Sequence, residues 1–227
     1  HEKMFHSEGY LALEYATFFQ IVFEYMYMDA IQLPKSWNVD QIIEDLDQHG
    51  FTLIDDAYPQ NYVQALAEEC TFNLNRFRDA AIQNGVVSNI RSDHILWISE
   101  ELEIAQHHIE TLKEISQVLN QNFYLGIQEV EAHFACYNAG EYYALHRDNP
   151  QGKNGRIIST VYYLHEDWQD DWGGELHLED KNGQWHTIQP KPNRIAMFQS
   201  DLLHEVIKAK HQRLSITAWL RSGNVLF

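Results

Sequence analysis

A histidine and an aspartate separated by a single residue could bind one metal ion together. His146 and Asp148 have this spacing. On a β-strand, side chains two positions apart point to the same face, so the imidazole and the carboxylate would lie side by side. They would form two-thirds of a facial triad, which suits a non-haem Fe(II) ion that keeps open coordination positions. Because a second His-x-Asp tripeptide occurs at His165–Asp167, the spacing alone is weak evidence.

The strongest supporting pattern lies near the end of the chain, where polar and apolar residues alternate from Arg213 to Leu220. A period of two puts a guanidinium, two hydroxyls and an indole on one strand face; these belong to Arg213, Ser215, Thr217 and Trp219. If this face meets solvent, the segment is an ordinary edge strand. If it faces inward, a buried arginine needs an anion, and a carboxylate is its natural partner. His204 precedes Arg213 by nine residues, so a strand, a turn and a return strand could bring both into one site.

Helices are expected in the first half of the chain. Asn38 with Gln41 resembles a capping box, and apolar residues follow it at helical spacing until Gly50. Further helices are predicted over about Gln60–Ile82 and over Glu100 to about Leu119, the latter capped by Ser99. A short strand is predicted at 51–54, between the first two helices.

After residue 120 the pattern changes to short alternating runs separated by turn signals. The predicted strands are Ile127–Tyr137, Tyr142–His146, Ile157–Leu164, Gly174–Glu179, Trp185–Ile188, Arg194–Phe198, Glu205–Ile207 and Arg213–Leu220. Eight short strands behind a helical layer indicate an α+β fold, a double-stranded β-helix (jelly-roll) sandwich buttressed by N-terminal helices. We expect helical support over about 38–120 and the sandwich over about 121–222.

At 227 residues, the chain is long enough for one domain with a full core, which we place at 28–227. Residues 1–27 are predicted to be an N-terminal extension or an artificial addition, with a dimer-forming apolar segment as the alternative. Glu14, Gln20 and Glu24 make the stretch Leu11–Met28 too polar for a transmembrane helix. A monomer or a weak homodimer without membrane contact is therefore expected.

Charge and cysteine content limit the partners and the compartment. A formal net charge of −17 argues against nucleic acid and leaves room for a basic or neutral peptide. The two cysteines, Cys70 and Cys136, provide no disulfide framework, so a reducing, cytoplasmic location is expected. Cys136 lies in an apolar run and is predicted to be a buried, inert thiol.

The ordered combination of His146, Asp148, His204 and Arg213 resembles the signature of 2-oxoglutarate- and Fe(II)-dependent dioxygenases. The resemblance is closest to the prolyl hydroxylase branch, particularly the hypoxia-factor prolyl hydroxylases and their bacterial relatives, and covers roughly residues 50 to 220. The matching segments are Ile90–Asp93, Trp97, Ala135–Tyr137, His146–Pro150, Gly155–Arg156, Tyr162–Leu164, Asp167–Trp168, Gly173–Gly174 and Arg213–Trp219. In this register His165 belongs to a strand end and turn. His177 is expected on an exposed sheet face, and His107, His108, His186 and His211 at the surface.

The resemblance implies a role for each matching residue. His146, Asp148 and His204 would bind Fe(II), and Arg213 would pair with the distal carboxylate of 2-oxoglutarate. Further residues near this cosubstrate would be Tyr163, Thr217 and Tyr137. The substrate pocket would be formed by Tyr143, Trp219, Arg156, Arg91 and Asp93, with an Asp93–Arg156 ion pair as one expectation and an ordinary surface pair as the other. Ascorbate is a candidate further cofactor.

The implied activity is hydroxylation of a prolyl residue in a protein or peptide with O2, releasing succinate and CO2. One alternative keeps the cofactors but acts on a free amino acid or another small molecule. Another is a cupin-like metal-binding sandwich without oxygenase activity, which would have no need for a buried guanidinium opposite the metal.

Overall fold

The computed structural model describes residues 32–80, 90–152 and 154–223, and from residue 33 onward these belong to the compact unit Leu33–Phe227. The predicted segment 1–27 and its boundary with the domain lie outside these residues. Within the described part of the chain, no helix has both the length and the apolar character that a membrane span requires.

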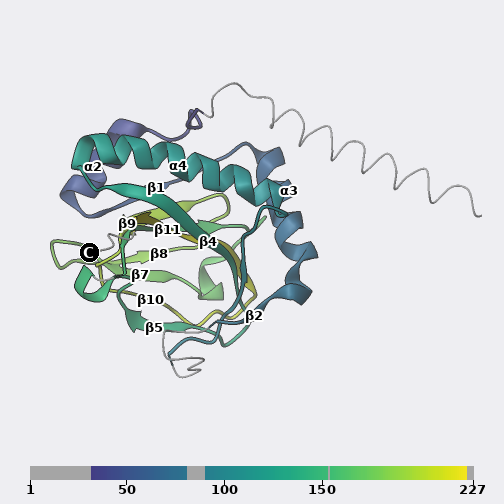
Figure 1. Ribbon diagram of the computed structural model, residues 1–227. Helices are drawn as coiled ribbons and strands as arrows, with labels where there is room; N and C mark the ends of the chain where they lie inside the picture. The colour runs from purple at the N-terminus through teal and green to yellow at the C-terminus, as the bar shows by residue number, and fades with distance from the viewer. Residues whose placement is uncertain (1–31, 81–89, 153, 224–227) are drawn as a thin grey trace, which may run out of the picture. The chain divides into compact units, whose positions relative to one another are not determined.

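Two antiparallel sheets form the sandwich (Figure 1). The larger has the strand order β1-β9-β6-β11-β4-β3-β2, and the smaller has the order β5-β10-β7-β8. The strands are β1 (Phe51–Ile54), β2 (Arg78–Asp79), β3 (His94–Trp97), β4 (Ile127–Tyr137), β5 (Tyr143–His146), β6 (Arg156–Tyr163), β7 (Leu176–Glu179), β8 (Trp185–Ile188), β9 (Ile195–Gln199), β10 (His204–Val206) and β11 (Arg213–Ser222). The predicted α+β fold with a double-stranded β-helix is confirmed.

Helices cover one face of the larger sheet (Figure 1): α4 packs on β4 and β11, α2 packs on β1, and α3 packs on α4. Their bounds are Val39–Gln48 for α2, Gln60–Phe72 for α3 and Glu103–Phe123 for α4, with 3-10 turns at Leu74–Arg76, Pro150–Gly152 and Asp170–Trp172. The predicted cap of α2 is present, because the Asn38 side chain accepts a hydrogen bond from the Gln41 N–H at 3.3 Å. This helical layer leaves the opposite face of the larger sheet to the smaller sheet.

Two predicted helix boundaries are wrong, both because of contacts distant in sequence. The second helix ends at Phe72, and β2 then pairs with β3, so strand pairing overrides the helical pattern that extended to residue 82. The helix predicted from Glu100 begins at Glu103, and Ser99 is not its cap. Instead, the Glu69 carboxylate of α3 accepts the N–H groups of residues 104 and 105 at 3.1 and 2.9 Å.

The prediction that His108 lies at the surface is also wrong. It is fully buried between α4 and the sheet, one turn after Ile104 on the core-facing side of the helix. Its Nδ1 lies 2.7 Å from the Tyr58 hydroxyl, and its ring packs on Tyr162 at 5.1 Å between centroids. Burial lowers the pKa of His108 to about 3 from the ordinary value of 6.5, so its ring is neutral at neutral pH.

This buried imidazole predicts a loss of stability in acid. The unfolded chain takes up a proton as the pH falls through 6.5, whereas the folded protein does so only near 3. The stability contribution is therefore complete above pH 6.5, and about 1.4 kcal/mol is lost per pH unit below it. The variant His108→Gln keeps a partner for Tyr58 but does not titrate. Between pH 7 and pH 5, we expect its free energy of unfolding to fall by about 2 kcal/mol less than that of the wild type. Urea unfolding at both pH values measures this difference, and equal losses would contradict the assignment.

Candidate active site

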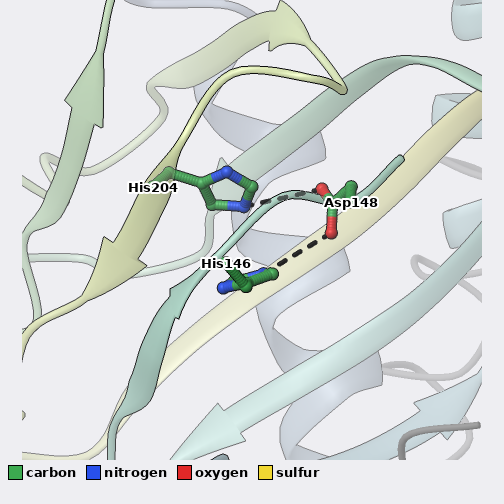
Figure 2. A group of neighbouring side chains, drawn as sticks. All are labelled: His146, Asp148 and His204. Carbon is green, nitrogen blue, oxygen red and sulfur yellow. Dashed lines mark ion pairs between the residues drawn. The ribbon is translucent and has the colours of Figure 1, made fainter. Parts of the chain in front are cut away.

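The three predicted metal ligands meet at the smaller sheet (Figure 2). His146 ends β5 and His204 begins β10, and the antiparallel register places these two residues directly opposite each other. Asp148 follows β5 by two positions. Its two carboxylate oxygens lie 3.5 Å from the Nε2 atom of His146 and 3.6 Å from that of His204. One ligand atom from each residue lies within 4.8 Å of the others, so a single ion could be bound by all three.

Each imidazole is held by its other ring nitrogen. The Nδ1 atom of His146 donates to the Ala144 carbonyl at 2.7 Å, and that of His204 donates to the Leu202 carbonyl at 2.9 Å. Because a carbonyl can only accept, the proton resides on Nδ1 and the Nε2 lone pair is free for a metal. Burial lowers the pKa of His204 to about 4, which keeps this ring neutral. The Tyr143 ring stacks on His146 at 3.6 Å between centroids and fixes its plane.

Asp148 is also oriented by its neighbours. The Ser159 hydroxyl donates to its Oδ2 atom at 2.7 Å and lies 2.8 Å from the Ser200 hydroxyl. Burial alone would raise the pKa of Asp148, but the two adjacent imidazoles and the Ser159 hydroxyl hold it well below its usual range. The site therefore presents two imidazoles and one anionic carboxylate, a donor set that fits Fe(II).

Removing the hydroxyl that orients Asp148 should weaken metal binding without removing a ligand. We expect Ser159→Ala to lower Fe(II) affinity by roughly 10- to 100-fold, as for other residues that orient metal ligands. An anaerobic Fe(II) titration followed by equilibrium dialysis measures this change. Thr160→Val is the matched control, because Thr160 is a buried neighbour on the same strand in the next position, where β-strand side chains face the opposite way. Equal Fe(II) affinities for the two variants would contradict the role of Ser159.

At the other end of the site, the Arg213 guanidinium is enclosed with only 1% of the residue exposed. The rings of Tyr137 and Tyr163 flank it, each with its centroid 4.9 Å from the guanidinium carbon. Within the described residues, Arg213 makes no ion pair, and its Nε and Nη2 atoms have no hydrogen-bond partner. A buried cation without an anion is costly, so the arrangement fits the distal carboxylate of a bound diacid.

One cavity connects the triad with Arg213. Its lining residues are Arg91, His133, Tyr137, Tyr143, His146, Asp148, Ser159, Val161, Leu176, Phe198, His204, Val206, Arg213, Thr217 and Trp219. Tyr163 lies at the Arg213 end of the cavity, because its ring contacts the Arg213 guanidinium. A larger hollow of about 660 Å³ lies beside the loop after Asp148, but no triad residue lines it. The chemistry therefore belongs to the smaller cavity.

The predicted substrate-pocket residues are only partly brought together. Tyr143, Trp219 and Arg91 line the cavity. Arg156 lies at the margin of the cavity, where its guanidinium carbon is 3.5 Å from the centroid of the Trp219 ring. The expected Asp93–Arg156 pair is wrong. Asp93 binds Arg91 through two hydrogen bonds of 2.8 and 2.6 Å, because side chains two positions apart share one side of the extended backbone.

Arg156 has a different carboxylate partner, Glu131, at 3.3 Å. Glu131 lies on β4 directly opposite Trp219 on β11, and the Arg156 guanidinium covers that indole. The cation at the margin is therefore held by one carboxylate and one aromatic ring.

Two polar residues of the cavity were missed by the sequence prediction, His133 on β4 and Ser159 on β6, as were the four apolar lining residues Val161, Leu176, Phe198 and Val206. The period-two alternation that pointed to Arg213 could also have identified these two polar residues. On β4, residues two apart share a face, which places His133 with Tyr137, and on β6 the same period places Ser159 with Tyr163.

The comparisons with known proteins agree with this geometry. A family model described as the 2OG-Fe(II) oxygenase superfamily matches residues 132–221. Egl nine homolog 1 of Homo sapiens is 29% identical over 200 residues, covering 80% of this chain and 46% of that protein. The chain spans about half the length of the curated relatives of this kind that it matches.

Solved structures are similar over a larger share of their length. A prolyl-4-hydroxylase of Pseudomonas putida has 32% identity and a TM-score of 0.76, over 81% of this chain and 98% of that one. A prolyl hydroxylase from Trichoplax adhaerens, solved with a peptide fragment of the hypoxia inducible factor oxygen degradation domain, has 26% identity and a TM-score of 0.74, over 81% and 89%. The chain therefore belongs to the 2OG-Fe(II) oxygenase superfamily, and within it resembles the prolyl hydroxylases.

Proposed function

We propose that the protein is an Fe(II)- and 2-oxoglutarate-dependent dioxygenase that hydroxylates a prolyl residue of a protein or peptide. The reaction would consume O2 and 2-oxoglutarate, place one oxygen atom in the prolyl C–H bond, and release succinate and CO2. The observation that carries the proposal is the buried guanidinium of Arg213, which has no carboxylate partner among the described residues and lines the same cavity as the His146, Asp148 and His204 triad.

When bound, Fe(II) and 2-oxoglutarate supply the chemistry that activates O2. The protein contributes orientation and exclusion of water. The carbonyls at 144 and 202 fix the two imidazoles with Nε2 toward the site, and Ser159 fixes the carboxylate. Arg213 would bind the distal carboxylate, with Tyr137 and Tyr163 beside it, and Thr217 would contact the cosubstrate from further along the same strand. Because the Arg213 end is enclosed, these contacts operate away from bulk water, where charge pairing is stronger.

A peptide substrate is supported by the aromatic walls of the cavity and by the relatives. Tyr143 and Trp219 line the cavity with aromatic side chains, the residue type that lines the grooves of domains binding proline-rich segments. The net charge of −17 favours a neutral or basic peptide and disfavours nucleic acid. Cys70 and Cys136 are both free thiols, which fits a reducing compartment such as the cytoplasm. The proposed assembly is a monomer or a weak homodimer.

Succinate release tests the activity directly. With Fe(II), 2-oxoglutarate and O2, we expect a library of capped pentapeptides with a central proline to stimulate succinate release, and a matched library with central alanine to have no effect. Mass spectrometry should show a gain of one oxygen atom on proline. Equal stimulation by free proline would favour a small-molecule substrate. No succinate from either source, with 2-oxoglutarate still bound, would contradict the proposed activity.

A further inference from the structure

A buried histidine with an unpaired nitrogen faces the cavity halfway along the larger sheet. His133 lies on β4 with only 2% of its surface exposed, directly opposite Thr217 on β11 and Trp97 on β3. Its ring contacts two indoles, at 5.1 Å from Trp97 and 5.3 Å from Trp219 between centroids. Among the described residues, its Nδ1 atom has no hydrogen-bond partner.

Such an atom requires an explanation, because nearly all buried polar atoms are paired and an unpaired one costs stability. Apolar side chains of similar size would fill this position between two indoles without that cost. Burial, helped by the nearby guanidinium groups of Arg91 and Arg156, lowers the pKa of His133 to about 3. The ring is therefore a neutral imidazole, able to donate one hydrogen bond and accept another.

The register separates His133 from the Arg213 end of the cavity. Arg213 is opposite Tyr137, which is four residues from His133 along β4, whereas His133 is opposite Thr217. Four residues of strand span roughly 13 Å, so His133 does not lie beside the guanidinium that would bind the distal carboxylate. On its other side His133 is paired with Trp97 of β3, whose exposed fraction is 49%. His133 is therefore a cavity residue whose neighbour on β3 reaches the protein surface.

We propose that His133 is a specificity-determining residue whose Nδ1–H donates a hydrogen bond to a main-chain carbonyl of the substrate, beside the target prolyl ring. This inference rests on the proposed function. A prolyl residue has no N–H, so the main-chain groups adjoining its ring are acceptors, and only a donor on the protein can pair with them. The indoles of Trp97 and Trp219 would contact the apolar ring while His133 binds the carbonyl.

The test measures peptide binding apart from turnover. The probe is the pentapeptide from the central-proline library that most stimulates succinate release by the wild type. Its affinity is measured by tryptophan fluorescence under argon, with 2-oxoglutarate and with Mn(II) in place of Fe(II). We expect His133→Leu to weaken binding of this peptide roughly tenfold and His133→Asn, which restores a donor, to recover part of it. The affinity for 2-oxoglutarate without peptide should not change.

Two controls make the result specific. Thr160→Val removes a buried hydroxyl that, like the Nδ1 atom of His133, has no hydrogen-bond partner among the described residues. Thr160 is paired on β11 with Ala218, which is not a cavity residue. This variant should therefore leave peptide affinity unchanged. A peptide with a thioamide in place of the carbonyl at proline or at the preceding residue accepts a hydrogen bond more weakly. One of the two thioamides should weaken binding to the wild type and have no further effect in His133→Leu.

The outcomes distinguish this inference from the proposed function. Wild-type succinate release with unchanged peptide affinity in His133→Leu would overturn the role of His133 alone. A change in 2-oxoglutarate affinity with unchanged peptide affinity would likewise overturn it and place the residue beside the cosubstrate. Absence of any response of the wild type to central-proline peptides would overturn both.

Discussion

Asp148→Asn is expected to abolish iron binding and with it all succinate release. Asp148 is the only anion among the three ligand residues, and it lies between the two imidazole nitrogens at 3.5 and 3.6 Å. Asparagine has almost the same shape but no charge, so the variant should fold normally and leave a divalent cation without a balancing anion. Residues that merely orient a ligand contribute 10- to 100-fold in metal affinity, so loss of this ligand should cost at least about 100-fold.

Anaerobic titration with Fe(II) and 2-oxoglutarate measures the effect, because the chelate gives a weak visible charge-transfer band. The chain contains a matched control in its second His-x-Asp tripeptide, where Asp167 is exposed and does not line the cavity. Asp167→Asn should give the wild-type band at the wild-type Fe(II) concentration. A normal band in Asp148→Asn, or an equal loss in both variants, would exclude the assigned triad.

The contrast between these two tripeptides illustrates what local sequence could and could not predict. The period-two alternation that begins at Arg213 correctly indicated a strand with its guanidinium on one face, because one strand's pattern reports directly on its two faces. It left open whether that face met solvent or the interior, and the structure shows Arg213 buried. Spacing could not choose between His146 and His165. That choice depends on which strand lies opposite His204, a pairing between segments nearly sixty residues apart in the chain.

Two of the three errors arise from contacts between residues distant in the chain. The second helix appeared to continue because its sequence has no strong breaker, yet β2 forms since β3 is available as a partner. His108 was placed at the surface because a polar type is usually exposed, whereas the Tyr58 hydroxyl provides it with a buried partner. The sequence prediction paired Asp93 with Arg156 across the pocket, whereas in the structure its carboxylate binds Arg91, two residues away. The first two contacts depend on residues distant in the chain, whereas the Arg91–Asp93 pair follows from a spacing of two that the sequence does contain.

Arg213→Met is expected to remove 2-oxoglutarate binding while leaving the protein without cosubstrate as stable as the wild type, or more so. Methionine fills much of the same volume with no charge. Removing one partner of a buried ion pair typically costs about 3–5 kcal/mol, which corresponds to roughly a 100-fold or greater loss of affinity. In the free protein, however, the described residues provide no carboxylate for Arg213, so the substitution removes an uncompensated buried cation.

Arg194 provides the opposite case within the same chain. It is 8% exposed, and its guanidinium pairs with both carboxylate oxygens of Asp55, whose pKa it holds below the usual range. Arg194→Met should therefore lower the unfolding temperature and leave 2-oxoglutarate affinity unchanged, the reverse of what we expect for Arg213→Met. Isothermal titration with 2-oxoglutarate and thermal unfolding without it measure both properties.

These paired measurements separate a ligand-binding arginine from a structural one. If Arg213→Met destabilised the free protein as much as Arg194→Met, the guanidinium would have an internal role that its unpaired nitrogens do not suggest. If 2-oxoglutarate bound both variants equally well, Arg213 would not be its anchor and the oxygenase proposal would lose its main support. An arginine kept buried without an anion among the described residues lowers stability, and a ligand that carries the missing anion accounts for its presence.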